Sequence, residues 1–167
     1  MKRVLPILVS LVMVAIIAGI FVSMAQKEGP VTVVSGNEAM KPLPIKLNHT
    51  NDTQCAMMIK SEENAAEVVA RDGRTWFFDD PGCMVLWLKD KPFREKAKLW
   101  VHTIDTKAWI DARKARYGVA DHTEMHYGFG ARQKDIAGSI GFEEMQLRMY
   151  RGENLTNPKI RKKLLGI

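Results

Sequence analysis

The chain has 167 residues, of which 25 are Lys or Arg and 19 are Asp or Glu, so its formal net charge is +6. Lys2 and Arg3 belong to an expected export signal, and without them 23 basic residues face 19 acidic ones, giving +4. This length provides material for one compact domain with a modest core. Nucleic-acid binding is not expected, because export removes the chain from the cytoplasm and no groove-reading motif is present.

Residues 1–25 predict a bacterial export signal. Lys2 and Arg3 form a positive start, and Val4 to Ala25 is almost wholly apolar. About 20 apolar residues can cross a hydrocarbon core as a helix, while Ser23-Met24-Ala25 resembles a cleavage site. The segment is therefore either a signal peptide or an uncleaved signal anchor, and the length of the apolar run favours the anchor. Both place residue 26 onward in the periplasm, tethered to the inner membrane if the helix is retained.

Residues 26–47 predict a semi-extended linker, with one short strand near residues 31–34. Residues 48–150 are expected to form the folded domain, and residues 151–167 a basic tail. The tail suits either an anionic lipid surface or an acidic partner, or it is simply a solvated end.

The order of elements in this domain predicts an α+β fold, built from two ββα-like units after the N-terminal helix. In the first unit, Asp80 is expected to cap a helix that has Pro81 at its first position and ends near Lys91-Pro92. The segments expected before this helix are a strand at Cys55–Ile59, a strand or short helix at Asn64–Ala70, and a strand at Thr75–Phe78. The segments expected in the second unit are a strand at Leu99–Ile104, a short helix at Trp109–Ala115, a strand at His126–Phe129, a helix at Gln133–Ile140, and a strand or helical turn at Phe142–Met149.

Soft sulfur donors are the most informative residues of the exported part. Cys55 and Met57 share one face if their segment is a strand. Cys83 is expected as the third residue of its helix, where the helix dipole favours a thiolate. Met125 and His126 add a thioether and an imidazole. Thiolate and thioether together select Cu(I), so the predicted metal ligands are Cys55, Met57, Cys83, Met125 and His126.

Two other interpretations remain open at this point. In an oxidising compartment Cys55 and Cys83 can form a structural disulfide in an interaction protein that binds no metal. Alternatively, Cys83 can serve a thiol-dependent enzyme. The sequence lacks a Cys-x-x-Cys pair, a His-Glu-x-x-His motif, a phosphate-binding glycine loop and a Gly-x-Ser-x-Gly motif. We therefore expect that the protein is not an enzyme.

Four ordered stretches resemble the NosL family of copper chaperones, which are tied to nitrous oxide reductase assembly. These stretches are Asp52-Thr53-Gln54-Cys55-Ala56-Met57, Trp76-Phe77-Phe78-Asp79-Asp80-Pro81-Gly82-Cys83-Met84, Trp109-Ile110-Asp111-Ala112 and Met125-His126-Tyr127-Gly128-Phe129-Gly130-Ala131. The resemblance implies paired ββα-like units, related to the core of organomercurial lyase, and one Cu(I) passed to an apo-enzyme. It also implies that Cys55, Met57 and Met125 are the copper donors.

The chain departs from the family pattern at several positions. The family commonly has Gly where Ala56 and His126 stand, and Pro where Glu124 stands. Many members carry a lipid-bearing cysteine, which is missing here. The expectation is a membrane-tethered periplasmic Cu(I) chaperone that supplies an apo-metalloenzyme such as nitrous oxide reductase. A membrane copper transporter is its other expected partner.

Overall fold

The computed structural model describes residues 4–25 and 29–166. The chain divides into two compact units, with the boundary in the sequence between Pro30 and Val31. The first unit holds the predicted N-terminal helix, α1 (Val4–Ala25). The predicted positive start, Met1 to Arg3, lies outside the described residues, as do residues 26–28 of the predicted linker. Within the described part of the chain, no helix combines the length and the apolar character needed to span a membrane.

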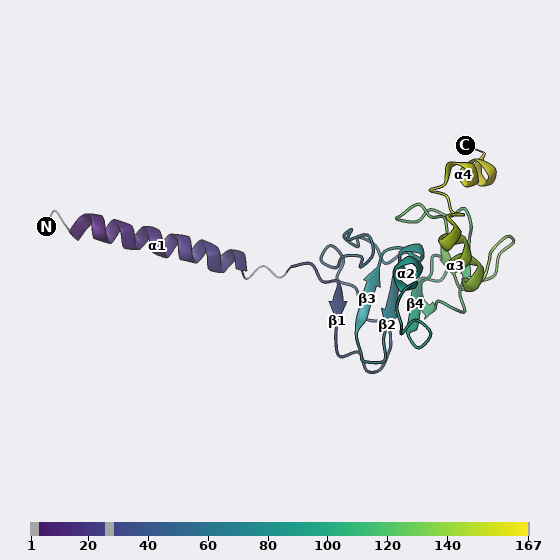
Figure 1. Cartoon of the computed structure of the whole chain (residues 1–167), viewed down its shortest axis with the longest axis horizontal. Coiled ribbons are helices and arrows are strands. Elements are labelled where there is room, and N and C mark those ends of the chain that lie inside the picture. The colour runs from purple at the N-terminus through teal and green to yellow at the C-terminus, as the bar shows by residue number, and fades with distance from the viewer. Residues whose placement is uncertain (1–3, 26–28, 167) are drawn as a thin grey trace. The chain divides into compact units, whose positions relative to one another are not determined.

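The second unit is built on an antiparallel sheet of five strands, in the order β1-β3-β2-β4-β5 (Figure 1). The strands are β1 (Val33–Val34), β2 (Ala66–Val69), β3 (Thr75–Phe78), β4 (Lys98–His102) and β5 (Trp109–Asp111). A separate pair, β6 (Arg116–Tyr117) and β7 (Ala131–Arg132), forms a two-stranded sheet. With helices α2 (Pro81–Leu88), α3 (Phe142–Arg151) and α4 (Pro158–Leu165), the predicted α+β class is confirmed.

The sheet separates two apolar clusters. On one face α2 packs against β2 and β3, and α3 packs against α2 and β6 (Figure 1). Phe78 points into this main core and Phe77 into a smaller cluster, because successive strand residues face opposite sides. Ile45 and Ile59 belong to the smaller cluster. Part of the stretch predicted as a linker thus packs against the sheet, and β1 within it pairs with β3.

The observed elements of the first ββα-like unit agree closely with those predicted from the sequence. β2 and β3 form where strands are predicted, and α2 begins with the predicted cap at Asp80 and with Pro81. The helix ends at Leu88, slightly earlier than predicted. The predicted strand at Cys55–Ile59 is wrong, because residues 53–55 form a turn.

The second ββα-like unit differs more from its prediction. Residues 109–111 pair with β4 as an edge strand instead of forming a helix, and residues 126–129 form a loop before β7. The helix predicted at 133–140 is replaced by turns, whose first N–H groups, from Gln133 and Lys134, donate to the Asp105 carboxylate at 3.0 and 2.9 Å. The second ββα-like unit closes with α3, which is capped after Arg151 by Gly152 with a φ of 68°.

Glu67 is a buried acid in the middle of the sheet. Its side chain is fully buried on β2, and both carboxyl oxygens accept from the backbone N–H of Leu43, at 3.2 and 3.0 Å. Burial raises the pKa of Glu67 from 4.5 to about 8, against a smaller lowering by the Leu43 hydrogen bond. Between these two values the unfolded chain ionises while the folded chain keeps the proton, so stability falls as pH rises through this window.

Replacement Glu67→Gln removes this titration and keeps an oxygen for the Leu43 N–H. We expect the variant to gain stability over the wild type as pH rises from 5 to 8, because one pKa unit between the two states corresponds to about 1.4 kcal/mol. Urea unfolding across this range measures the difference. Parallel pH curves for the two proteins would show that Glu67 is not held protonated.

Candidate metal centre

One side of the site is formed where β3 runs into α2. The Asp80 carboxylate accepts from the N–H of Gly82 at 2.7 Å and so caps the helix. Pro81 fits the first helical position because its missing N–H would have no partner there. Cys83 then lies in the first turn of α2 with its side chain fully buried. The local sequence signal for this half of the site is strong.

Cys55 lies on a tight turn that forms the other side of the site. The Asp52 carboxylate accepts from the N–H groups of Gln54 and Cys55, at 2.6 and 2.9 Å. The backbone closes the turn in both directions, with Ala56 N–H donating to the Asp52 carbonyl at 3.0 Å and Asp52 N–H to the Met57 carbonyl at 2.7 Å. Ala56 has a φ of 62°, a left-handed conformation that a non-glycine residue adopts at a cost.

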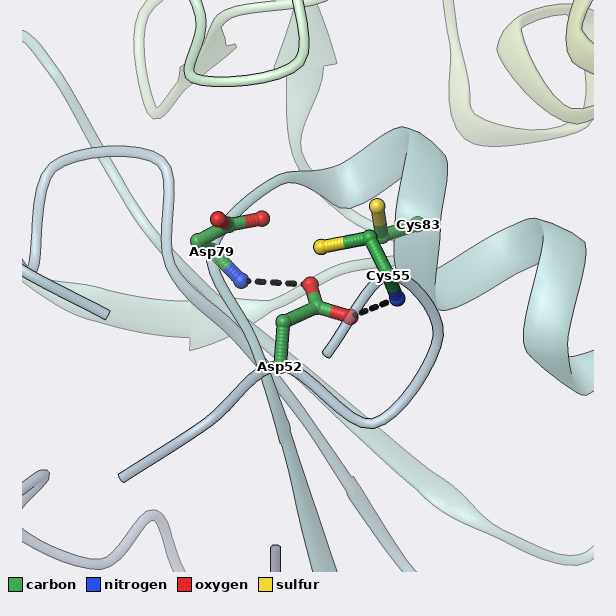
Figure 2. A group of neighbouring side chains, drawn as sticks. All are labelled: Asp52, Cys55, Asp79 and Cys83. Carbon is green, nitrogen blue, oxygen red and sulfur yellow. Dashed lines mark hydrogen bonds between the residues drawn. The ribbon is translucent and has the colours of Figure 1, made fainter. Parts of the chain in front are cut away.

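Asp52 also joins the two halves. Its second carboxylate oxygen accepts from the N–H of Asp79, directly after β3, at 2.9 Å. One donor atom from each of Asp52, Cys55, Asp79 and Cys83 then lies within 4.8 Å of all the others. Figure 2 shows the two sulfur atoms next to each other, with the Asp79 carboxyl group beside them. A metal–thiolate bond is about 2.3 Å long, so one ion can bridge sulfur atoms at this separation.

Burial controls the protonation of this group. It raises the pKa of Cys55 to about 11, and the nearby Asp52 and Asp79 add to the effect, while a backbone hydrogen bond with Met57 opposes it. The pKa of Cys83 is raised further, again mainly by burial. The thiolate that the helix position predicts for Cys83 is therefore wrong, because burial disfavours the charged form and the charges of Asp52 and Asp80 add to the rise in pKa. Without a bound cation, both thiols are protonated at neutral pH.

Asp79 has a protonated carboxyl group with one oxygen that makes no hydrogen bond to the described residues. Burial raises its pKa to about 8, and its hydrogen bond and charge interaction with Asp52 add to this. Its buried Oδ1 has no hydrogen-bond partner among the described residues. Buried polar oxygens are normally paired, so this atom is consistent with a ligand at the site.

The two predicted thioether ligands take different positions. Met57 follows Cys55 in the turn, and its side chain is 43% exposed. Met125 is half-buried and packs against the hydrophobic cluster that contains Cys83. Its N–H donates to the second carboxylate oxygen of Asp80 at 3.2 Å, which brings the Met125 loop to the start of α2.

His126 is not part of the four-residue group. It is exposed, and its ring lies next to that of His122, with 5.5 Å between the ring centroids. Of the predicted ligands, the structure brings Cys55 and Cys83 together in that group, and Met125 contacts the cluster around Cys83.

Sequence reasoning missed the two carboxylates. Asp52 precedes Cys55 by three residues, a spacing at which an Asp side chain often bonds the backbone of a turn. That local signal was available. The position of Asp79 beside Cys55 depends on the packing of the turn against β3, for which the sequence carries no local signal.

No family model matches the chain, and no match was found among curated proteins. The geometry of the site is therefore what indicates its chemistry. Two thiols and two carboxyl groups that converge in a largely buried position can hold a metal ion.

The structure predicts very different reactivities for the two thiols. Cys55 is half-buried and should react with iodoacetamide slowly at neutral pH, with a rate that rises toward pH 11 because the thiolate is the nucleophile. Cys83 is fully buried and should react only when the protein unfolds. Mass spectrometry after timed alkylation measures both rates, with the denatured chain as control. Equal rates for the two native thiols would contradict this site geometry.

Proposed function

We propose that this protein is a periplasmic Cu(I) metallochaperone that delivers copper to an apo-metalloenzyme. One observation carries the proposal: the thiols of Cys55 and Cys83, from separate segments, lie within 4.8 Å of each other in a group of four donors. Nitrous oxide reductase is the acceptor that the NosL resemblance suggests. We further propose that the N-terminal segment, as signal anchor or cleaved signal peptide, places the domain outside the inner membrane, near a membrane copper transporter.

The donor set favours a soft ion over a hard one. Both oxygens of the Asp52 carboxylate already accept backbone N–H groups, and Asp79 keeps its proton at neutral pH. The two sulfur atoms are then the donors most available, and thiolates select Cu(I) among the ions that cells handle routinely. Zn(II), which usually takes four ligands, is the main competing ion.

Backbone geometry supports the NosL resemblance independently of the sulfur atoms. Ala56 and His126 occupy the two positions where that family commonly has Gly. Both have left-handed backbone conformations, with φ values of 62° and 55°. Glycine adopts this conformation without strain, so the family's residue preference agrees with the backbone of this chain at both positions.

The exposure of the donors suggests how an ion is passed on. Cys83 is fully buried, whereas Cys55 is half-buried and Met57 is 43% exposed. Cu(I) is stable with two or three ligands, so an incoming sulfur or imidazole of the acceptor can bind before Cys55 leaves. The ion would then be transferred through shared coordination from the Cys55 side, while Cys83 holds it until the end.

Equilibrium competition with a chromophoric Cu(I) chelator, without oxygen, tests the proposal. Cys55→Ser should weaken Cu(I) binding by more than the about 10- to 100-fold that loss of a supporting contact costs at metal sites. Met57→Leu should weaken it less. Met58→Leu is the matched control, because Met58 is 44% exposed and adjacent in sequence, and it should bind as the wild type does.

Wild-type affinity in Cys55→Ser would refute the ligand assignment. A site that prefers Zn(II) when both ions are offered would refute the copper function while leaving the metal centre in place. The same sulfur proximity also permits a Cys55–Cys83 disulfide. If alkylation of the native protein finds a disulfide that resists reduction, and no copper is bound, the interaction-protein alternative holds instead.

One feature favours a second candidate, thiol-dependent cleavage of a carbon–mercury bond. The protonated Asp79 carboxyl lies beside both thiols. In this reaction the two thiols lose their protons as their sulfur atoms bind mercury, the carbon–mercury bond breaks as the carbon takes a proton from Asp79, and Asp79 regains one thiol proton while the other goes to solvent. Release of hydrocarbon from an organomercurial by the wild type, and its loss in Asp79→Asn, would support this candidate. Copper binding without any such turnover would eliminate it.

A further inference from the structure

His122 and His126 form a donor pair that contains no residue of the sulfur centre. We propose that they make a second, surface metal site for a borderline divalent cation of the nickel, copper and zinc class. Imidazole nitrogen is the ligand that these ions share. The inference goes beyond the proposed function and uses none of the sulfur atoms or carboxyl groups of the first site.

The separation of the two rings suits a shared ion. Their centroids lie 5.5 Å apart and their planes are inclined by 53°. With metal–nitrogen bonds of about 2.0 Å, two imidazoles on a tetrahedral ion have ring centres roughly 5 Å apart, so small rotations of these exposed side chains bring both rings onto one ion. Both residues are exposed, so an ion can reach them from solvent.

The loop between the two histidines is braced at several points. Asn64 donates from its side-chain amide to the carbonyl of His122 at 3.3 Å. Met125 donates through its N–H to Asp80 at 3.2 Å, and the Thr123 side chain also hydrogen-bonds to Asp80. Asp80 is fully buried, so this anchor is fixed to the core. Ligands held on a braced backbone lose little conformational entropy when they bind.

The backbone of His126 is in a strained conformation, and core packing of its side chain does not account for this strain. Its φ is 55°, a value that suits glycine, and its N–H donates to the carbonyl of Thr123 at 2.9 Å to close the turn. The ring is exposed, so it contributes little to the core. Residues held in such conformations are concentrated at functional sites, and here the strain presents the second imidazole next to the first.

A hollow of about 380 Å³ adjoins the pair. Its wall includes Asp121, Leu155, Arg161 and Leu165. The Asp121 carboxylate accepts from Arg132 at 2.6 Å, and its other oxygen is buried without a hydrogen-bond partner among the described residues. An ion on two imidazoles keeps open coordination positions, and the hollow leaves space for water or an anionic co-ligand near Arg161.

Calorimetric titration of the tag-free full chain with Ni(II) near neutral pH, with reductant present, tests this site. We expect one Ni(II) site per chain in Cys55→Ser, in which the sulfur site has lost a ligand and does not add a second one. His122→Gln and His126→Gln should each weaken binding about tenfold or more, because either change leaves a single imidazole. His49→Gln is the control histidine and should bind as the wild type does. The histidine variants made in Cys55→Ser should lose this remaining site, which separates it from the Cu(I) centre.

Three results would overturn the proposal: no Ni(II) binding by the wild type, unchanged binding in both histidine variants, or loss of binding in Cys55→Ser. Paramagnetic broadening provides a second readout that does not depend on affinity. Substoichiometric Ni(II) should broaden the ring signals of His122 and His126 in the wild-type spectrum and leave those of His49 and His102 sharp. Broadening confined to other residues would also exclude the site.

Discussion

The candidate metal centre depends on the carboxylate of Asp52. One oxygen accepts the N–H groups of Gln54 and Cys55 and so shapes the turn, and the other accepts the N–H of Asp79 at the end of β3. Asp52 is fully buried, so these charge-assisted bonds are made away from solvent, where they are strong. Together with the N–H of Thr53, which donates to the Phe77 carbonyl at 2.9 Å, they hold the Cys55 turn on the sheet and so bring the two sulfur atoms together.

The same arrangement supports the proposed selectivity, because the carboxyl groups can lie near a bound ion without selecting a hard one. A carboxylate whose oxygens already accept backbone N–H groups has few lone pairs left for a metal. Asp79 keeps a proton for a different reason, since it is buried beside Asp52. One acid is therefore used for folding and the other is largely neutral, and the soft character of the thiols determines the proposed ion.

The sequence predicts those parts of the fold and site that short-range signals determine. The cap at Asp80, Pro81 at the helix start, and the β-branched and aromatic run of β3 are local, and each of them forms as predicted. Residues 109–115 look helical, yet residues 109–111 pair with β4 as an edge strand, because tertiary pairing overrides a weak propensity. The turn at Cys55 had a local signal in Asp52, three residues earlier, but its position beside Asp79 depends on packing against β3, for which the sequence carries no local signal.

The difference in burial between the two cysteines is the feature that suits a carrier. A site with two fully buried thiols would hold an ion that an acceptor could not reach, and a site with two exposed thiols would release it to any competing ligand. Here Cys83 lies in the core and Cys55 lies on a turn whose next residues, Ala56 and Met57, are exposed. Since both thiols are protonated without a cation, the proposed ion would displace protons when it binds, and the sulfur atoms would regain protons when it leaves. Tight retention and release to a specific acceptor can then coexist in one small site.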